Sequence, residues 1–246
     1  MSKAPASLPQ GRRVYAIGDI HGCARQLDAL HALIAQDLAE RPVERPLLLH
    51  IGDYVDRGAD TKGVIDRLVA GCPIPGVEMV NLMGNHESTM LDAIAGERAA
   101  GTDWLFAGGK AALESYGIDP EGPRDVWKDM IPAMHQEFLR GLILMHREGG
   151  YAFVHGGVRP NIPLEQQARE DLLRARQPFL YSEADFGAVI VHGHTPVKTA
   201  VVKHNRIAID TGAVFGGKLT AAVLEGETVG FLTADPVDPP VSMVHR

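Results

Sequence analysis

Aspartate, histidine, asparagine and arginine side chains gather in five short segments of this chain, most of them flanked by glycine. The segments are Gly18-Asp19-Ile20-His21-Gly22, Gly52-Asp53-Tyr54-Val55-Asp56-Arg57-Gly58, Gly84-Asn85-His86-Glu87, His155-Gly156-Gly157 and His192-Gly193-His194-Thr195-Pro196. Each segment alone is compatible with a turn or a helix cap. Together they offer imidazole and carboxylate groups, a ligand set that suits Mn, Fe and Zn. The combination is typical of a two-metal centre for phosphoryl transfer.

The first three segments each follow a short apolar stretch that predicts a buried β-strand. These strands are expected at about 14–17, 47–51 and 77–83, with amphipathic helices at about 24–39 and 61–70 between them. In open α/β sheets, ligands bind beyond the carboxyl ends of the strands. We therefore expect the polar segments to meet at one edge of the sheet.

The remainder of the chain divides into three parts. Residues 97–140 mix short helical patterns with Gly and Pro and predict a helical insertion, in which Trp104 and Trp127 are core anchors. Strands are then expected at 151–154, 188–191, 206–209, 219–224 and 228–233. The proline-containing end, 234–246, is expected to be a flexible tail. One domain is predicted over 1–246, with its core at about 14–233.

Composition narrows the class of protein. With 24 Lys and Arg against 31 Asp and Glu among 246 residues, the net charge is −7, which argues against non-specific binding to nucleic acid. The chain lacks a stretch of about 18–20 apolar residues, the length of a membrane span. Its two cysteines, Cys23 and Cys72, fit a reducing compartment. We expect a cytoplasmic protein with neither membrane nor nucleic acid as a partner.

The ordered motifs resemble those of the PPP-type phosphoprotein phosphatases, in the calcineurin-like metallophosphoesterase superfamily. The similarity is greatest to the bacterial and phage branch, which shares the Gly-His-Thr-Pro sequence and a segment like Asp210-Thr211-Gly212-Ala213-Val214-Phe215. It extends from about Val14 to Leu224. The resemblance implies an α/β fold of the αββα type, in which helices flank two mixed β-sheets and a dimetal site lies at the sheet edge.

The resemblance also implies a role for each motif residue. Asp19, His21 and Asp53 would bind one divalent ion, and Asn85, His155 and His194 would complete the second site, with Asp53 bridging. The ions would be Mn, with Fe and Zn as alternatives. His86 would protonate the leaving group and Asp56 would orient its imidazole. Arg57 would bind the phosphate.

A second phosphate-binding arginine is expected before the Gly-His-Thr-Pro segment, in a Trp-x-Arg sequence. Here the corresponding residues read Arg174-Ala175-Arg176, so Arg176 takes the expected position and Arg174, which replaces the tryptophan, is the competing candidate. His192 is not assigned to a metal. Other histidines, among them His31 and His50, have no clustered partner and are expected to be structural or surface groups.

The implied activity is a metal-dependent phosphatase that hydrolyses phosphoserine and phosphothreonine in proteins or peptides by direct attack of a metal-bridging hydroxide. The alternative is a symmetrical dinucleoside tetraphosphate hydrolase or a metallophosphoesterase of broad specificity. Two divalent ions would more than balance the Asp19 and Asp53 carboxylates, so an acidic chain can still bind phosphate. Substrate, preference for phosphotyrosine, metal and oligomeric state stay open.

Two other classes of function are less consistent with the sequence. Residues 212–218 match the P-loop pattern Gly-x-x-x-x-Gly-Lys, but Leu219 occupies the Ser/Thr position and a strand is expected where a helix is required. A catalytically inactive scaffold is the other possibility. Nothing favours it, because every expected ligand and the expected acid are present.

Overall fold

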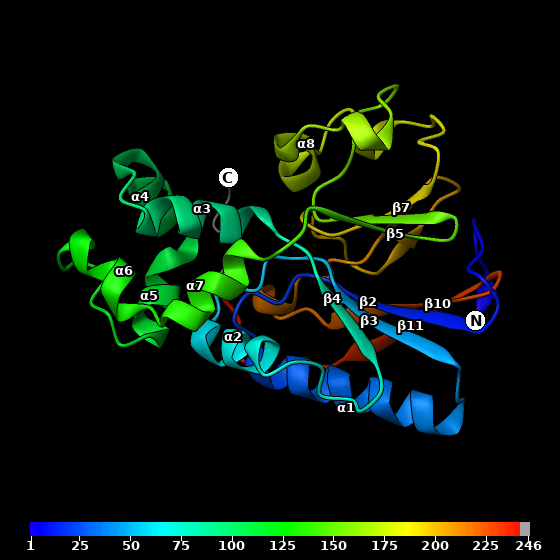
Figure 1. The fold of residues 1–246 in the computed structure, drawn as a ribbon, viewed down its shortest axis with the longest axis horizontal. Helices are drawn as coiled ribbons and strands as arrows, with labels where there is room; N and C mark the ends of the chain where they lie inside the picture. Colours follow the sequence, from blue (N-terminus) through cyan, green and yellow to red (C-terminus); the bar gives the residue numbers. More distant parts are fainter. Residues whose placement is uncertain (242–246) are drawn as a thin grey trace.

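Two mixed β-sheets pack face to face in the computed structural model, which describes residues 1–241. Helices cover both outer faces of this pair of sheets (Figure 1). The predicted α/β architecture, two sheets flanked by helices, is confirmed.

The first sheet has the strand order β1-β11-β10-β2-β3-β4. Its strands are β1 (Ser2–Lys3), β2 (Arg12–Ile17), β3 (Arg45–His50), β4 (Glu78–Asn81), β10 (Leu219–Glu225) and β11 (Thr228–Ala234). The pairs β2·β3 and β3·β4 are parallel, and the remaining pairs are antiparallel. The predicted strands β2, β3 and β4 therefore lie next to one another and end at the same edge.

The second sheet has the order β5-β6-β7-β9-β8. It comprises β5 (Met145–Glu148), β6 (Tyr151–Val154), β7 (Val189–His192), β8 (Val201–Val202) and β9 (Arg206–Ala208). Strands β6, β7 and β9 are parallel, whereas β5 and β8 run antiparallel at the two edges.

The side chains of β2 alternate between the two faces of the first sheet and show how the apolar layers form. Val14 and Ala16 are buried against the second sheet, whereas Tyr15 and Ile17 are buried on the opposite face, under the helix α1 (Ala24–Glu40). Successive side chains of a strand point to opposite faces, so one strand contributes to two apolar layers. A third apolar layer, which includes Ile190 and Phe179, lies on the outer face of the second sheet.

The remaining helices lie around these layers. They are α2 (Thr61–Val69), α3 (Asn85–Ile94), α4 (Arg98–Trp104), α5 (Lys110–Ser115), α6 (Trp127–Met130), α7 (Ala133–Arg140) and α8 (Arg169–Arg174). Helices α4 to α7 group together at the left of Figure 1, and α8 lies above the second sheet. The segment 98–140 is thus a run of short helices. Among the described helices, none combines the length and the apolar character needed to cross a membrane.

The predicted tail begins on the last residue of β11, and its final five residues, 242–246, lie outside the described part of the chain. Before that point the chain makes specific contacts. Asp238 accepts hydrogen bonds from the main-chain N–H of Gln26 (2.9 Å) and from the Arg25 side chain (3.1 Å), and the Val241 N–H donates to the carbonyl of Val214 (2.8 Å).

Candidate metal centre

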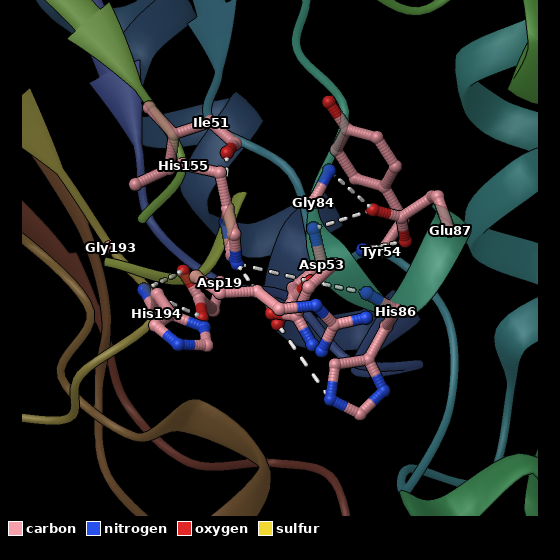
Figure 2. A network of polar contacts seen from close by, with 12 residues as sticks. Asp19, Ile51, Asp53, Tyr54, Gly84, His86, Glu87, His155, Gly193 and His194 are labelled. Carbon is pink, nitrogen blue, oxygen red and sulfur yellow. Dashed lines mark hydrogen bonds and ion pairs between the residues drawn. The ribbon is translucent and has the colours of Figure 1, made fainter. Parts of the chain in front are cut away.

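The loops that follow β2, β3, β6 and β7, together with the N-terminus of α3, bring the predicted polar residues to one edge of the two sheets (Figure 2). Five residues in these loops have a positive φ although none is glycine: His21 (44°), Asp53 (54°), Asp56 (72°), Arg57 (67°) and His194 (61°). A non-glycine residue in this region costs about 1–3 kcal/mol and often marks a functional site. Backbone strain is therefore concentrated where the sequence predicts chemistry.

Asp53 lies at the centre of the cluster. Its Oδ1 is 3.2 Å from His155 Nε2, and its Oδ2 is 3.4 Å from His21 Nε2 and 3.9 Å from His86 Nε2. Two groups of mutually close donor atoms share this carboxylate: Asp53 with His21 and His86, and Asp53 with His155 and His194. Within each group the donor atoms lie within 4.8 Å of one another. Two adjacent cation sites joined by Asp53 are compatible with this arrangement.

Two glycines allow the carboxylates to approach the backbone. A Cβ at Gly84 would lie 2.2 Å from Asp53 Oδ1, and a Cβ at Gly193 would lie 2.1 Å from Asp19 Oδ1. Any larger residue at either position would displace a carboxylate. The glycines of the sequence motifs thus have a steric role at the site.

Backbone carbonyls fix the orientation of two imidazoles. His21 Nδ1 lies 2.8 Å from the carbonyl oxygen of Val55, and His155 Nδ1 lies 3.1 Å from that of Ile51. A carbonyl only accepts, so Nδ1 carries a proton in both rings, and Nε2 faces the cluster. Metal-binding histidines commonly donate their second N–H in this way. The donor set and its orientation therefore fit divalent metal ions.

The charges of the cluster also fit a cation. Burial and the neighbouring Asp210 carboxylate raise the pKa of Asp19 well above its usual range. Burial also acts to raise the pKa of Asp53, but the imidazoles of His155 and His86 outweigh burial and hold this pKa well below its usual range. Although burial lowers it, Asp53 and Asp19 raise the pKa of His155 to about 9. The buried carboxylates of Asp19, Asp53 and Asp210 lie close together, and bound cations would stabilise such a group of negative charges.

The other predicted ligands lie beside these groups. Asn85 Oδ1 is 3.0 Å from His155 Nε2. Asp19 accepts the main-chain N–H of His194 on both of its oxygens (3.1 and 3.2 Å), yet it belongs to neither group of mutually close donors. His86, which the sequence predicts to be an acid, lies within the His21 group. The structure thus brings all six predicted ligands to one place, with His86 among them.

Asp56 links His86 to the run of short helices at residues 98–140, which we call the helical segment. Its Oδ2 is 2.7 Å from His86 Nδ1, and its Oδ1 accepts the indole N–H of Trp104 at 2.7 Å. All three side chains are at most 3% exposed. Burial raises the pKa of Asp56 to about 8, and the indole N–H acts against this by stabilising the charged form. Trp104 is buried as predicted, but the sequence did not indicate its contact with the site.

The arginines differ in their contacts. Arg57 Nη1 donates to His21 Nε2 at 2.7 Å and the guanidinium lies over the ring of Phe215, 5.6 Å from its centre. Arg176 Nε donates to His194 Nε2 at 3.2 Å, whereas Arg174 donates to Thr89 Oγ1 at 2.9 Å. Arg57 and Arg176 therefore each contact a different expected metal ligand.

Glu87 contributes in a way that sequence reasoning did not identify. Its buried carboxylate accepts four main-chain N–H groups, those of Asp53 (2.8 Å), Tyr54 (2.7 Å), Val55 (3.1 Å) and Gly84 (2.8 Å). It thereby holds the strained Asp53 loop against the N-terminus of α3. The only signal in the sequence is the glutamate at the third helical position, which is typical of a capping box.

His192 lies outside the cluster. Its ring packs edge-on against Phe179, with 4.9 Å between ring centres, on the outer face of the second sheet. It therefore stays unassigned. Residues 212–218 contain a short 3₁₀ turn, Ala213–Phe215, and run directly into β10, so the helix that a P-loop requires is absent from this part of the described chain.

Comparisons with known proteins agree on the family. The profile of the calcineurin-like phosphoesterases matches residues 12–227. A serine/threonine-protein phosphatase 1 of Salmonella typhimurium is 27% identical over 87% of this chain and 93% of its own. A symmetrical bis(5'-nucleosyl)-tetraphosphatase of Nitrosomonas europaea is 30% identical, over 73% of this chain and 59% of its own. An asymmetrical bis(5'-nucleosyl)-tetraphosphatase of Anoxybacillus flavithermus is 27% identical, over 83% and 87%.

A solved structure, the cold-active protein-tyrosine phosphatase of a psychrophilic Shewanella species, has a similar fold. Its TM-score is 0.60 with 18% identity, over 96% of this chain and 83% of that one. At this identity, the similarity concerns the fold alone.

Proposed function

The chain belongs to the calcineurin-like phosphoesterase family, and on that premise we propose that it hydrolyses phosphomonoesters of serine and threonine in proteins. The observation that carries this proposal is the His86–Asp56 contact of 2.7 Å beside the Asp53 carboxylate, because a His86 imidazole held by Asp56 would be an oriented proton donor next to the candidate cation sites. Alkoxide leaving groups, such as those of phosphoserine and phosphothreonine, require such a donor.

In this proposal the six ligands hold two divalent ions. Asp19, His21 and Asp53 would bind the first ion, and Asn85, His155 and His194 would bind the second together with Asp53. When bound, the ions supply Lewis-acid polarisation of the phosphate and activation of water. Manganese is the first candidate and Fe and Zn are alternatives, since all three accept mixed imidazole and carboxylate ligands.

The side chains of the protein position the ester and move one proton. Arg57, in contact with His21, and Arg176, in contact with His194, would bind the non-bridging phosphate oxygens. His86 would give the proton on Nε2 to the ester oxygen as the bond from phosphorus to that oxygen breaks, while Nδ1 stays bonded to Asp56. The products are the free hydroxyl of the protein and inorganic phosphate, and one water molecule is consumed.

The finer substrate assignment rests on the relatives. The 27% identical relative that covers most of both chains is named a serine/threonine-protein phosphatase, which supports a phosphoprotein substrate. The second candidate is symmetrical hydrolysis of dinucleoside tetraphosphates, and the observation in its favour is the 30% identical tetraphosphatase. We place the phosphoprotein first because its relative matches over nearly its full length.

A substrate panel tests the proposal. The purified protein is loaded with Mn, Fe or Zn and assayed against phosphoserine, phosphothreonine and phosphotyrosine peptides and against diadenosine tetraphosphate. We expect the largest kcat/KM on the phosphoserine or phosphothreonine peptide. A larger value on diadenosine tetraphosphate, with ADP as the sole product, would establish the second candidate instead.

A further inference from the structure

Trp104 connects the helical segment to the proposed acid. It is the last residue of α4, has no exposed surface, and its indole N–H donates to Asp56 Oδ1 at 2.7 Å. The other carboxylate oxygen, Oδ2, contacts His86 Nδ1 at 2.7 Å. An indole nitrogen is a donor only, so this bond determines which oxygen of Asp56 is left for His86.

The indole itself is held in one place. Its ring packs edge-on against Trp127, with 5.3 Å between ring centres and 77° between the planes. On another side it meets Gly109, where a Cβ would lie 2.7 Å from three atoms of the indole. Only glycine leaves this space open. The tryptophan can therefore act as a rigid support for Asp56.

The same segment also holds the residue after Asp56. The chain bends at Gly108 (φ 117°) between α4 and α5, and the carbonyl of Gly108 accepts the main-chain N–H of Arg57 at 3.1 Å. Asp56 and Arg57 are consecutive residues with positive φ. Such a strained pair persists only where its surroundings hold it, and here the helical segment contacts both residues.

We infer that Trp104 is a positioning residue for leaving-group protonation: through Asp56 it holds the His86 imidazole in the orientation that delivers a proton to the ester oxygen. The inference rests on the proposed function, in which His86 is the proton donor. It also gives the helical segment a part in turnover, since the support for the donor comes from α4 and not from the two sheets.

Trp104→Phe tests the inference because it removes the N–H and keeps most of the ring. Phenyl phosphate has a leaving group that needs a proton, whereas dinitrophenyl phosphate has one that does not. We expect kcat to fall about 10–100-fold on phenyl phosphate, the loss that is typical when a hydrogen-bond partner behind a residue of a metal centre is removed. On dinitrophenyl phosphate kcat should change less than about twofold. An equal loss on both esters would show a merely structural role and overturn the inference.

Trp127→Phe is the matched control. Trp127 is equally buried in the same ring pair, but its indole N–H has no hydrogen-bond partner among the described residues. The control should leave unchanged the ratio of kcat on phenyl phosphate to kcat on dinitrophenyl phosphate. If it alters the ratio as much as Trp104→Phe does, the effect comes from packing and the inference fails.

Gly109→Ala provides a second route should Trp104→Phe fail to fold. It keeps the N–H but forces the indole to move, so we expect the same selective loss on phenyl phosphate. An unchanged ratio in this variant would contradict the inference.

His86→Asn separates the inference from the proposed function on which it rests. If His86→Asn leaves the phenyl phosphate rate unchanged, the acid assignment itself is wrong. If it lowers that rate selectively while Trp104→Phe and Gly109→Ala behave like Trp127→Phe, only the role of Trp104 is wrong. If His86 is the acid and Trp104 positions it, Trp104→Phe should cause no further loss on phenyl phosphate in a protein that already carries His86→Asn.

Discussion

Asp53 is the one carboxylate that both groups of donor atoms share. We predict that Asp53→Asn has the largest effect of any single substitution at the site, because it removes a negative charge next to both proposed ions. Activity should fall by more than about 10⁴-fold, the upper end of the loss expected without a general acid, and metal content measured by elemental analysis should fall from two ions to one or none.

His86→Asn is the comparison for this prediction. It should keep its metal content and lose about 10²–10⁴ in kcat, the range for general-acid catalysis. Circular dichroism should show both variants folded. Full metal occupancy in Asp53→Asn would contradict the shared-ligand assignment.

Residue types indicated which side chains gather at the edge of the two sheets (Figure 2), but not what supports them. Asp19, Asp53 and His155 could be predicted because metal-type donors recur at strand ends beside glycine. The contact of Trp104 with Asp56 joins residues 48 positions apart, on elements whose relative placement no local pattern encodes. Its apolar ring suggested a core residue, and only the fold shows where its N–H points.

At the scale of elements, Glu87 fastens the N-terminus of α3 to the loop after β3. Each of its oxygens accepts two main-chain N–H groups. In Glu87→Gln one oxygen becomes an NH₂ group, which cannot accept, so two buried N–H groups lose their partners. We predict that the free energy of unfolding falls by about 2–6 kcal/mol, at about 1–3 kcal/mol for each unsatisfied group.

Urea unfolding at neutral pH measures this change. Asp92→Asn, an exposed acid-to-amide substitution on the same helix, is the control and should be within about 0.5 kcal/mol of the wild type. A Glu87→Gln variant as stable as Asp92→Asn would show that the Asp53 loop does not depend on the carboxylate.

The contact between α1 and β3 depends on two neutral histidines. His31 Nε2 lies 3.0 Å from His50 Nε2, and His50 Nδ1 lies 2.8 Å from Asn81 Oδ1. If His50 donates to the amide oxygen, its Nε2 must accept from His31, and a proton on His50 Nε2 would break the chain. Burial lowers the pKa of His31 to about 4 and that of His50 to about 3.

This pair predicts a pH dependence of stability. In the unfolded chain both histidines bind protons near the ordinary pKa of about 6.5, but in the folded protein they do so only near pH 4 and below. Between about pH 4 and pH 6.5 the unfolded state therefore binds more protons than the folded state. Stability should be full above about pH 6.5 and fall as the pH drops towards 4, by about 1.4 kcal/mol per pH unit for each histidine.

His31→Gln tests the pH dependence, since its amide N–H can still donate to His50 but does not titrate. Urea unfolding of the metal-free proteins at pH 7, 6 and 5 should give the variant a smaller slope than the wild type. Equal slopes would mean that His31 is not responsible. The sequence offered no hint of this pair, because each histidine looks isolated until α1 packs on β3.

Element positions were more predictable than their pairing. The apolar runs that became β2, β3, β6 and β7 are continuous because both faces of these strands are buried. By contrast, β1 and β8 are two-residue edge strands, and β5 carries His146, Arg147 and Glu148 at a sheet edge. Their identity as strands comes from their neighbours, so local pattern could not predict them.

At the scale of the whole molecule, two ties join the sheets at opposite ends of β2. Before the strand enters the core, Arg12 pairs with Glu78 of β4 (2.8 Å) and with Glu148 of β5 in the other sheet (2.7 Å). Beyond its other end, Asp19 and Asp53 from the first sheet meet His155 and His194 from the second. The first tie is a set of ion pairs, whereas the second brings carboxylates together and would be completed by the proposed cations.

Metal binding should therefore stabilise the entire fold and not only the site. With an ion at about 100 times its Kd, the folded state gains about 2.7 kcal/mol, which for a chain of this size raises Tm by about 5–10 °C. Thermal melts of chelated protein with added Mn²⁺ should show this rise. Ca²⁺, which prefers ligand sets made only of oxygen, should produce a much smaller one. The Asp53→Asn variant should lose most of the Mn²⁺ effect because each proposed site loses its shared ligand. If Mn²⁺ does not change the Tm of the wild type, or raises the Tm of Asp53→Asn as much as that of the wild type, the cations do not join the two sheets.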